Sequence, residues 1–287
     1  MIEKRICIVG LGLMGGSLAK ALNGQVLQLT GVDRHAATRQ QALADGALDI
    51  VTDDIASGLK TADLVILATP VHSILNILAE LPQIRPDGCL VMDLGSTKKE
   101  ISAAMNALPD SFAAIGGHPM CGKETAGYRA ADEELFRGQT FILSRNDRTT
   151  RQLETIALSL IELIGAKPLF LPADEHDQLV AAASHLPYLL SAALMHRAAK
   201  MEDARVWPVS ASGFRDTTRL AGSDPRMMLD ILLTNRDAVL PQLAQYIADL
   251  ESMFKLLDEN DEAALYAWLE AAQQAYTAYR RQKMDSG

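Results

Sequence analysis

The chain has 287 residues, of which 48% are hydrophobic and 22% are charged. This length suggests two domains, and the composition excludes a disordered, collagen-like or coiled-coil chain. The formal net charge is −9 and Lys and Arg form no cluster along the sequence, so we expect small-molecule partners and no nucleic acid.

The three cysteines, Cys7, Cys89 and Cys121, form no CxxC motif and leave an odd thiol. This pattern does not fit a secreted disulfide framework and favours a reducing compartment. The apolar stretches at residues 6–19 and 64–79 fall short of the ~18 unbroken apolar residues of a membrane span. We therefore expect a cytoplasmic protein without a membrane segment.

Over about the first 171 residues, short aliphatic runs alternate with longer stretches of mixed polarity. This alternation predicts strand-helix units, and the nearly continuous apolar runs are typical of strands covered by helices on both faces. We expect an α/β fold with a doubly wound, mostly parallel sheet of the Rossmann type. The predicted strands cover residues 5–10, 27–32, 64–68, 89–93, 112–115, 140–143 and 167–171. One predicted helix begins at Gly15, and three others cover residues 73–79, 98–107 and 151–164.

A GxGxxG motif follows the first predicted strand and opens a helix, with Gly10, Gly12 and Gly15 as its glycines and Leu13 and Met14 between the last two. The first glycine allows a tight turn, the second lets the backbone approach a pyrophosphate, and the third lets the helix pack on the strand. The first N–H groups of the helix would face the anion. A glycine-rich turn without a ligand is the alternative.

Asp33 closes the second predicted strand, 18 residues after Gly15. Its carboxylate could accept hydrogen bonds from the adenosine ribose of a dinucleotide and would repel a 2′-phosphate. Arg34 could attract such a phosphate, although a solvated surface charge is the commoner role for an arginine after a strand. NAD is therefore the expected cofactor, and NADP stays open.

Two further loops should face a dinucleotide, because the carboxyl ends of parallel strands line the ligand crevice of such sheets. One loop holds Thr69 and Pro70, and the other runs from Asp93 to Lys98 and contains Ser96. Ser96 is a site candidate by its position. Its alternative role is to cap the following helix, and the two roles can coexist.

The segment Gly116-Gly117-His118-Pro119 follows the next predicted strand. The two glycines would let backbone and ligand come close, and Pro119 favours an extended His118 that presents its imidazole in a fixed direction. Histidine can accept a proton near neutral pH, so His118 is the candidate base. A hydrogen-bonded structural histidine is the alternative.

After Pro172 the apolar positions follow helical spacing, first over residues 173–200 and again over residues 226–257. Residues 206–225 are rich in Gly, Ser, Thr and Pro and are predicted to form an ordered loop between these helices. We therefore predict an α/β dinucleotide-binding domain over residues 1–172 and an all-helical domain over residues 173–287.

Two segments of the helical domain carry candidate substrate-binding side chains. Pro187 interrupts a helical pattern, so the helix should kink or break there, beside His185, whose alternative role is structural. The segment with Arg215, Asp216 and Arg219 offers guanidinium groups to a substrate carboxylate, or an internal salt bridge as the alternative. No metal is expected, because the six histidines show no metal-ligand spacing.

Five motifs in this order, GLGLMGGS, DLGSTK, GGHPMCGKE, SHLP and GFRDTTR, resemble those of the prephenate/arogenate dehydrogenase family of tyrosine biosynthesis. The resemblance spans nearly the whole chain. It implies the oxidative decarboxylation of a cyclohexadienol, in which hydride passes from the carbinol carbon to the nicotinamide and carbon dioxide leaves from the ring carboxylate. It also implies a homodimer formed through the helical domain, with active sites in the cleft between domains.

The resemblance implies roles for individual residues as well. His118 would accept the proton of the substrate hydroxyl, because removing that proton raises the tendency of the carbinol carbon to donate hydride. Ser96 would hold the hydroxyl and the imidazole in line. Arg219 would grip a substrate carboxylate, and His185 would take the place of a substrate-side histidine.

Other positions match the family less directly. Glu124 matches an acid that some relatives use in gating or substrate choice, with a solvated loop acid as the alternative, and Asp216 matches its ionic partner. Two departures stand out: Tyr188 replaces a second histidine that prephenate-using relatives often carry, and Met228 replaces a tryptophan. Since the neighbourhood of Tyr188 touches the substrate in the family, prephenate and arogenate both stay open.

Two other functions remain as alternatives at this stage. One is a different dehydrogenase with the same two-domain architecture, of the β-hydroxyacid or imine reductase type. The other is a nucleotide-sensing binding protein without catalytic activity. The joint presence of His118, Ser96 and Arg219 favours an enzyme over the sensor.

Overall fold

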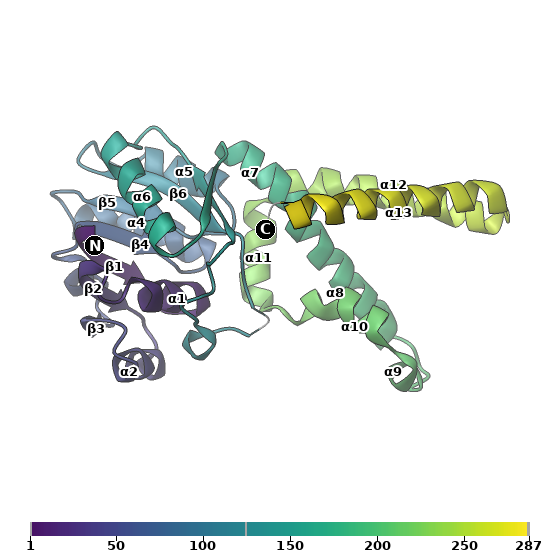
Figure 1. Cartoon of the computed structure of the whole chain (residues 1–287), viewed down its shortest axis with the longest axis horizontal. Helices are drawn as coiled ribbons and strands as arrows, with labels where there is room; N and C mark the ends of the chain where they lie inside the picture. Colours follow the sequence, from purple (N-terminus) through teal and green to yellow (C-terminus); the bar gives the residue numbers. More distant parts are fainter. Residues whose placement is uncertain (1, 124, 286–287) are drawn as a thin grey trace. The chain divides into compact units, whose positions relative to one another are not determined.

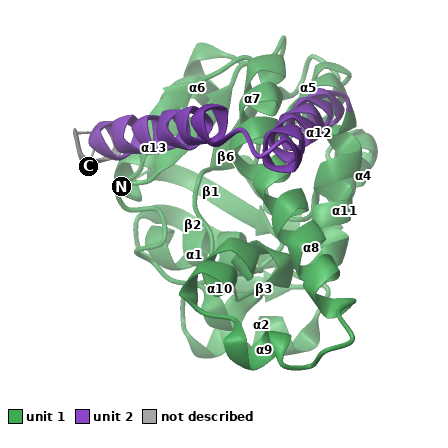
Figure 2. Cartoon of the chain, turned by 90° about the vertical axis from the view of Figure 1, so that its right-hand side faces the viewer, with its two compact units in different colours: residues 1–236 green, residues 237–287 purple. Residues whose placement is uncertain are grey.

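The computed structural model describes residues 2–123 and 125–285. By its contacts the chain divides into two compact units, Met1–Arg236 and Asp237–Gly287 (Figure 2). The larger unit contains the sheet and the first group of helices, and the smaller one contains two long helices.

The sheet of the larger unit has eight strands among the described residues, in the order β3-β2-β1-β4-β5-β6-β7-β8. Figure 1 labels β1 to β6. All neighbours from β3 to β6 pair in parallel, β7 runs antiparallel to β6, and β8 is parallel to β7. The strands are β1 (Ile2–Val9), β2 (Val26–Val32), β3 (Ile50–Thr52), β4 (Leu64–Leu67), β5 (Leu90–Asp93), β6 (Ala113–Pro119), β7 (Thr140–Ser144) and β8 (Lys167–Phe170). The predicted mostly parallel sheet is confirmed.

Helices cover both faces of this sheet, as a doubly wound fold requires. Among the described residues, the α-helices of the α/β part are α1 (Leu13–Leu22), α2 (Ala36–Ala44), α3 (Ile55–Leu59), α4 (Val71–Ile84), α5 (Lys99–Asn106) and α6 (Arg151–Leu163). Side chains of α1, α2 and α6 form one buried cluster with one face of the strands, and side chains of α3, α4 and α5 form a second cluster with the other face. The predicted helix at Gly15 begins two residues earlier, at Leu13.

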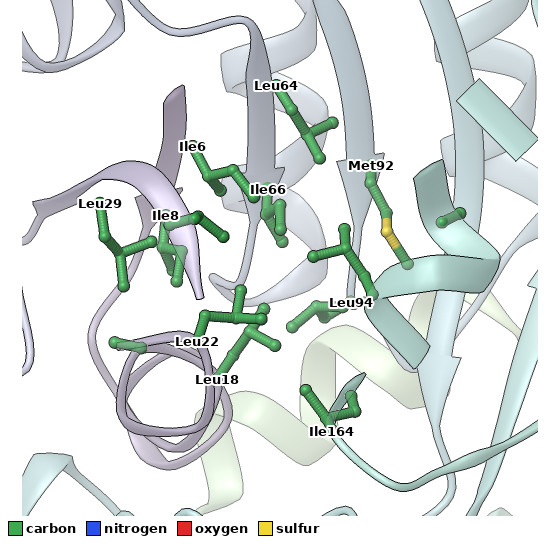
Figure 3. Close-up of a cluster of buried hydrophobic side chains, with 14 of the residues drawn as sticks. Ile6, Ile8, Leu18, Leu22, Leu29, Leu64, Ile66, Met92, Leu94 and Ile164 are labelled. Atoms are coloured by element: carbon green, nitrogen blue, oxygen red, sulfur yellow. The ribbon is translucent and has the colours of Figure 1, made fainter. Parts of the chain in front are cut away.

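The first cluster shows why alternate residues of a strand divide between the two faces. Ile6 and Ile8 of β1 point toward Leu18 and Leu22 of α1, with Leu29 of β2 beside them (Figure 3). Successive side chains of a strand point to opposite faces, so Cys7 and Val9 belong to the second cluster. Burying each aliphatic side chain contributes roughly 1.5–3 kcal/mol, which fixes the register of β1 in the centre of the sheet.

The order of the strands reverses at β1, which lies between β2 and β4. In open parallel sheets a ligand crevice forms outside the carboxyl ends of the strands at such a point. The segments that follow β1, β4 and β5, together with the end of β6, therefore share the edge where a ligand would bind.

The larger unit continues as a helical part. It comprises α7 (Ala173–Val180), a π turn η2 (Ala181–His185), α8 (Leu186–Ala199), α9 (Val206–Val209), α10 (Ser212–Thr218), a 3₁₀ turn η3 (Arg219–Gly222) and α11 (Pro225–Thr234), whereas the 3₁₀ turn η1 (Tyr128–Ala130) lies between β6 and β7 in the α/β part. The loop predicted over residues 206–225 is therefore wrong, because α9, α10 and η3 occupy it. The hydroxyls of Thr217 and Thr218 donate to the carbonyls of Gly213 and Phe214, so these residues bond within a helical turn in place of a loop.

The irregularity predicted at Pro187 takes the form of a π turn. The helical run from α7 to α8 stays continuous, and η2 widens it directly before Leu186. A proline cannot donate the usual backbone hydrogen bond, and a single π turn accommodates such a defect without breaking the helix. His185 lies at the end of this turn, where the backbone departs from regular α geometry.

One described helical stretch, Ala173–Ala199, is long and apolar enough to cross a membrane by length and composition alone. It carries the buried polar side chains His176, Asp177 and His185, and it is part of the larger unit. An apolar helix that packs within a protein passes the same test, so this stretch is weak evidence for a membrane segment.

The smaller unit consists of α12 (Arg236–Asp258), which begins at the last residue of the larger unit, and α13 (Glu262–Asp285). Asn260 between them has a positive φ of 52°, a conformation that asparagine tolerates better than most residues. Both helices expose large apolar side chains: Ile247, Leu250, Phe254, Leu257, Tyr266, Trp268, Leu269, Tyr276 and Tyr279. Such a concentration of exposed apolar groups is typical of a surface that another chain covers.

Candidate active site

The glycine turn, residues 10–15, combines two positions without room for a side chain with one open position. Gly10 has a φ of +94°, and a Cβ there would lie 2.7 Å from the carbonyl oxygen of Ala68. A Cβ on Gly15 would lie 1.9 Å from the carbonyl oxygen of Gly10. A Cβ on Gly12, in contrast, would meet no described atom within 4 Å. The first and third glycines thus close the turn, and the second leaves space in front of it.

The N-terminus of α1 faces this space with free backbone donors. Gly12 is its N-cap, no described side chain caps it, and its first turn contains no acidic residue. Leu13 and Met14 supply the first N–H groups of the helix. These groups have no carbonyl acceptor within the helix, because no helical turn precedes them. The positive end of the helix dipole adds to these donors, so the turn can bind a phosphate group.

Asp33 ties the end of β2 to the glycine turn. One of its carboxylate oxygens accepts from Leu11 N at 2.9 Å, and the other accepts from His35 N at 2.8 Å. The oxygen that accepts from Leu11 keeps a lone pair for a further donor, such as a ribose hydroxyl, whereas the other oxygen also lies 3.2 Å from Nδ1 of His35. Arg39 donates to the Asp33 carbonyl at 2.8 Å, while Arg34 is exposed at the surface.

Thr69 and Pro70 follow β4, beside the glycine turn. The Thr69 hydroxyl is buried and has no hydrogen-bond partner among the described residues, and a Cβ on Gly10 would lie 2.7 Å from the Thr69 methyl. A buried hydroxyl without a partner costs free energy unless a ligand or water completes it. The open turn, the Asp33 carboxylate and this hydroxyl together fit a dinucleotide.

His118 lies within β6, not after it as the sequence predicted, because β6 extends to Pro119 and pairs with β7. The adjacent glycines also serve a different purpose from the predicted one. A Cβ on Gly117 would lie 2.6 Å from the Asp93 carbonyl oxygen, and one on Gly116 would lie 3.1 Å from the Lys98 side chain. These glycines let β6 approach β5 and the buried Lys98, so their contacts are with the protein.

His118 is the first member of a hydrogen-bonded chain of three side chains. Its Nδ1 lies 2.8 Å from Nε2 of His176, and Nδ1 of His176 lies 2.7 Å from a carboxylate oxygen of Asp177. The two imidazole rings meet edge to face, with centroids 5.0 Å apart. His176 and Asp177 are buried on α7, whereas His118 is partly exposed. The chain therefore leads from the protein interior to the edge of the sheet.

Asp177 also caps α5. Its two carboxylate oxygens accept from Lys98 N at 2.7 Å and from Lys99 N at 2.9 Å. The cap position of α5 is Lys98, so the alternative role of Ser96 as the helix cap is wrong. Ser96 is half-buried in the segment between β5 and α5, and its candidacy as a site residue stays a prediction.

A buried ion pair lies beneath the same segment. Lys98 Nζ contacts the Asp93 carboxylate, and both side chains are fully buried. Asp93 also accepts from Gly95 N at 2.7 Å and from Gly117 N at 3.2 Å, so the pair joins the end of β5 to β6. Burial, and then the charges of His176, Lys98 and His185, lower the pKa of His118 well below its usual value. At neutral pH the His118 imidazole is therefore uncharged.

His185 joins this group through Asn235. The Asn235 side-chain nitrogen donates to the Asp177 carbonyl at 2.8 Å and lies 3.1 Å from Nδ1 of His185. Burial lowers the pKa of His185 to about 4, although the charge of Asp177 acts in the opposite direction. We call His118, His176, Asp177, His185 and Asn235 the histidine cluster.

The remaining predicted substrate-side residues lie around α8 and η3. Tyr188 is half-buried on α8, and Arg219 is exposed at the start of η3. Ala221 N of η3 donates to the Ser191 hydroxyl of α8 at 3.0 Å, which joins these two elements. Asp216 is exposed and pairs with Arg215 at 3.3 Å. No described hydrogen bond or ion pair joins Tyr188 or Asp216 to the histidine cluster. Glu124 lies outside the described residues.

The sequence missed four residues that surround His118: Lys98, His176, Asp177 and Asn235. The DLGSTK motif did place Lys98 in a segment at the ligand edge, which was a usable signal. His176 and Asp177 lie 58 or more positions from their partners His118 and Lys98, and no spacing rule connects them. Their adjacency at the start of an apolar helix was the only hint.

Comparison with known proteins identifies the family. Residues 18–169 match the family described as prephenate dehydrogenase, nucleotide-binding domain, and residues 172–271 match the one described as prephenate dehydrogenase, dimerization domain. A prephenate dehydrogenase of Bacillus subtilis is 34% identical over 279 residues, which cover 94% of this chain and 75% of that protein. A cyclohexadienyl dehydrogenase of Zymomonas mobilis is 32% identical over 284 residues, 97% of each chain.

Solved structures agree with the sequence comparison. The crystal structure of prephenate dehydrogenase from A. aeolicus, in complex with hydroxyphenyl propionate and NAD⁺, superposes with a TM-score of 0.89 at 28% identity. The match covers 97% of this chain and 99% of that one. The chain thus belongs to the prephenate dehydrogenase family and is an NAD-dependent dehydrogenase, as its five motifs predicted.

Proposed function

We propose that the protein catalyses the oxidative decarboxylation of prephenate to 4-hydroxyphenylpyruvate, with NAD⁺ as the oxidant. The observation that carries this proposal is the chain of hydrogen bonds that ends at His118, at the ligand edge of a nucleotide-binding sheet. It combines an uncharged imidazole with a neighbouring site that fits a dinucleotide. Those are the two parts that removal of a hydroxyl proton together with a hydride requires.

The glycine turn and its neighbours would hold the cofactor. The backbone of Gly10, Gly12 and Gly15 would leave room for the pyrophosphate, and the N–H groups of Leu13 and Met14 would bind it. The supporting observations are the open space at Gly12 and the uncapped N-terminus of α1. Bound NAD⁺ supplies the hydride acceptor.

Asp33 would select NAD over NADP, since its carboxylate binds ribose hydroxyls and repels a 2′-phosphate. Arg34 beside it could tolerate that phosphate, and Thr69 and Pro70 would line the other side of the cofactor site. A kinetic comparison of NAD with NADP tests this assignment. Replacing Asp33 by Asn removes the negative charge and keeps an oxygen acceptor for one of the two backbone N–H donors. The ratio of kcat/KM for NAD to that for NADP should therefore decrease.

His118 would act as the base. Because its pKa is lowered, the imidazole is free to accept the hydroxyl proton at neutral pH. The O–H bond of the substrate breaks and an N–H bond forms on His118, while the carbinol carbon loses hydride and the ring carboxylate leaves as carbon dioxide. Ser96, half-buried at the same edge, would keep the hydroxyl in line with the imidazole.

Cationic and polar groups of the helical part would bind the rest of the substrate. Arg219 would grip a carboxylate, and His185 and Tyr188 would contact the ring side, with Glu124 and Asp216 at the margin of the site. These assignments follow the family motifs in the SHLP and GFRDTTR segments. Arogenate, which carries an amine in place of the keto group, is the alternative substrate.

A steady-state assay that follows the reduced nicotinamide tests the reaction. Prephenate and arogenate are each supplied with NAD and with NADP, and we expect the highest kcat/KM for prephenate with NAD. Higher kcat/KM with arogenate would reassign the substrate within the family. Failure to turn over either substrate would refute the proposal and favour a nucleotide-sensing protein.

We also propose that the protein is a cytoplasmic homodimer, with a nucleotide-binding domain over residues 1–172 and a dimerisation domain over residues 173–287. The match to a dimerization domain and the exposed apolar side chains of α12 and α13 support the dimer. Size-exclusion chromatography with light scattering should give twice the mass of the chain at micromolar concentration. A monomer there would contradict this assembly.

A further inference from the structure

The proposed reaction assigns no role to three buried residues of the histidine cluster: His176, Asp177 and Asn235. They come from α7 and the end of α11, and they connect to His118 and His185 by hydrogen bonds. The inference below rests on the proposed function of His118 as the base. It concerns which nitrogen of each ring carries a proton.

The assignment begins at Asp177, whose surroundings consist of donors. Its two carboxylate oxygens accept from the backbone N–H groups of Lys98 and Lys99 at 2.7 and 2.9 Å. One of these oxygens also lies 2.7 Å from Nδ1 of His176. A carboxylate held by two N–H groups acts as an acceptor, so the proton between it and His176 belongs to His176 Nδ1.

The proton position in His176 then determines that in His118. A neutral imidazole with a proton on Nδ1 has a lone pair on Nε2. Nε2 of His176 lies 2.8 Å from Nδ1 of His118, so a neutral His176 accepts there and His118 donates from Nδ1. The Nε2 of His118 is consequently unprotonated, which is the form that a base needs.

We propose that His176 and Asp177 are positioning residues that fix His118 in the tautomer with a free Nε2, turned toward the substrate hydroxyl. They act through His118 and do not touch the substrate. When His118 takes the hydroxyl proton on Nε2, its Nδ1–H still donates to His176, and Asp177 stabilises the positive charge that develops along the chain. No further proton transfer is needed.

Asn235 fixes the opposite tautomer in His185. Its amide nitrogen donates to the Asp177 carbonyl, which can only accept, so the amide orientation is determined. The second hydrogen of that nitrogen points to Nδ1 of His185 at 3.1 Å, which must then be the acceptor. A neutral His185 carries its proton on Nε2. The same group of residues therefore provides one ring as an acceptor and the other as a donor.

Two substitutions of His176 separate positioning from packing. In His176→Gln the side-chain oxygen can reach the place of Nε2 and accept from His118, whereas His176→Phe retains a ring without an acceptor. We expect kcat to fall by about 100-fold or more in His176→Phe, and by less than about tenfold in His176→Gln. The Kd for NAD should change by less than about threefold in both. A packing role predicts the reverse order, because phenylalanine preserves the ring.

The matched control is His72→Phe. His72 lies on α4 and pairs with Asp230 of α11 at 2.8 Å, so it is a second histidine-aspartate pair outside the cluster. Its side chain is half-exposed. We expect kcat to stay within about threefold of the wild type in this variant. A 100-fold loss here would overturn the special role assigned to His176.

The tautomer itself is measured by ¹⁵N NMR of protein labelled at histidine, with the His118 signals identified by their absence in His118→Asn. We expect the protonated nitrogen of His118 to be Nδ1 in the wild type and in His176→Gln, and the Nε2 form to appear in His176→Phe. An Nε2-protonated His118 in the wild type would overturn the proposal. This measurement needs no substrate, so it stays decisive even if neither prephenate nor arogenate reacts, an outcome that would refute only the proposed function.

Discussion

The glycine turn and the histidine cluster belong to the same compact unit, and they are built in opposite ways. The turn comes from one continuous segment between β1 and α1, and it depends on missing side chains: a Cβ on Gly10 or Gly15 would collide with backbone atoms. The cluster comes from β6, α7, η2 and the residue after α11, and it depends on the hydrogen-bonding atoms of its side chains.

This difference determines how each region responds to mutation. A site made of backbone and empty space is damaged by adding atoms, and the damage appears in cofactor binding. A site made of linked side chains is damaged by removing an acceptor or a charge, and the damage appears in turnover and in stability. The variants below separate these two kinds of response.

The largest effect should come from His118→Asn. Asparagine keeps a polar group at this place in β6 but cannot act as a base near neutral pH, so we expect kcat to fall by about 10²–10⁴-fold. The glycine turn is untouched, so the Kd for NAD, measured by fluorescence titration, should stay within about threefold. A variant that keeps its turnover would show that His118 is not the base, and one that loses NAD affinity equally would show that the two regions are not independent.

The same contrast explains what the sequence could predict. The glycine motif, Asp33 and His118 were recognisable because each occupies a fixed place relative to a strand with a strong apolar pattern. His176 and Asp177 acquire a role only where α7 approaches β6 and α5, and no local pattern encodes that approach. For the fold, β3 was missed because its three residues are partly exposed and form no apolar run.

The second largest effect should be the loss of stability in Lys98→Met. This variant leaves the buried Asp93 carboxylate with its backbone donors at Gly95 and Gly117 but without a counter-ion. Removing one partner of a buried ion pair typically costs about 3–5 kcal/mol. Urea unfolding followed by circular dichroism measures the change, and a cost below about 1 kcal/mol would contradict the view that this pair supports β5 and β6.

Arg137→Met provides the control for that experiment. Arg137 pairs with Glu134, and their side chains are 69% and 54% exposed. Exposed ion pairs contribute about 0–1 kcal/mol, so this variant should unfold at nearly the wild-type urea concentration. Lys98→Met combined with Asp93→Leu should recover part of the lost stability, because the unpaired charge is then gone.

A smaller and more selective effect is expected from Gly12→Ala. Its φ of −72° is allowed for alanine, and the added methyl meets no described atom within 4 Å, so the melting temperature should not change. The methyl would occupy the space proposed for the pyrophosphate, and KM for NAD should rise about tenfold or more. Gly15→Ala should lower both NAD affinity and the melting temperature, because its methyl would overlap the Gly10 carbonyl. Equal behaviour of the two variants would refute the distinction between space for a ligand and space for packing.

The smallest effect concerns the stability of the histidine cluster in acid. The His185 ring lies against Asn235, and its pKa depends on its burial and on the nearby charges of Asp177 and His176. This pKa is about 4 in the folded protein, against 6.5 for the unfolded chain. Between these pH values the unfolded chain binds more protons than the folded protein does. The free energy of unfolding therefore rises as the pH rises and decreases as the pH falls. The loss from this group between pH 7 and pH 5.5 should be about 1 kcal/mol. The lowered pKa of His118 acts in the same direction.

Urea unfolding at pH 7, 6 and 5.5 measures this dependence in the wild type and in His185→Gln. The glutamine can accept from Asn235 but does not titrate, so the decrease toward pH 5.5 should be smaller than in the wild type, with the contribution of His118 remaining. His196→Gln replaces an exposed histidine of α8 and should leave the decrease unchanged. The glycine turn contains no titratable side chain, so Gly12→Ala should also follow the wild-type curve. Identical pH curves for the wild type and His185→Gln would mean that His185 is not buried as an uncharged ring, and the tautomer assigned to it through Asn235 would fail with it.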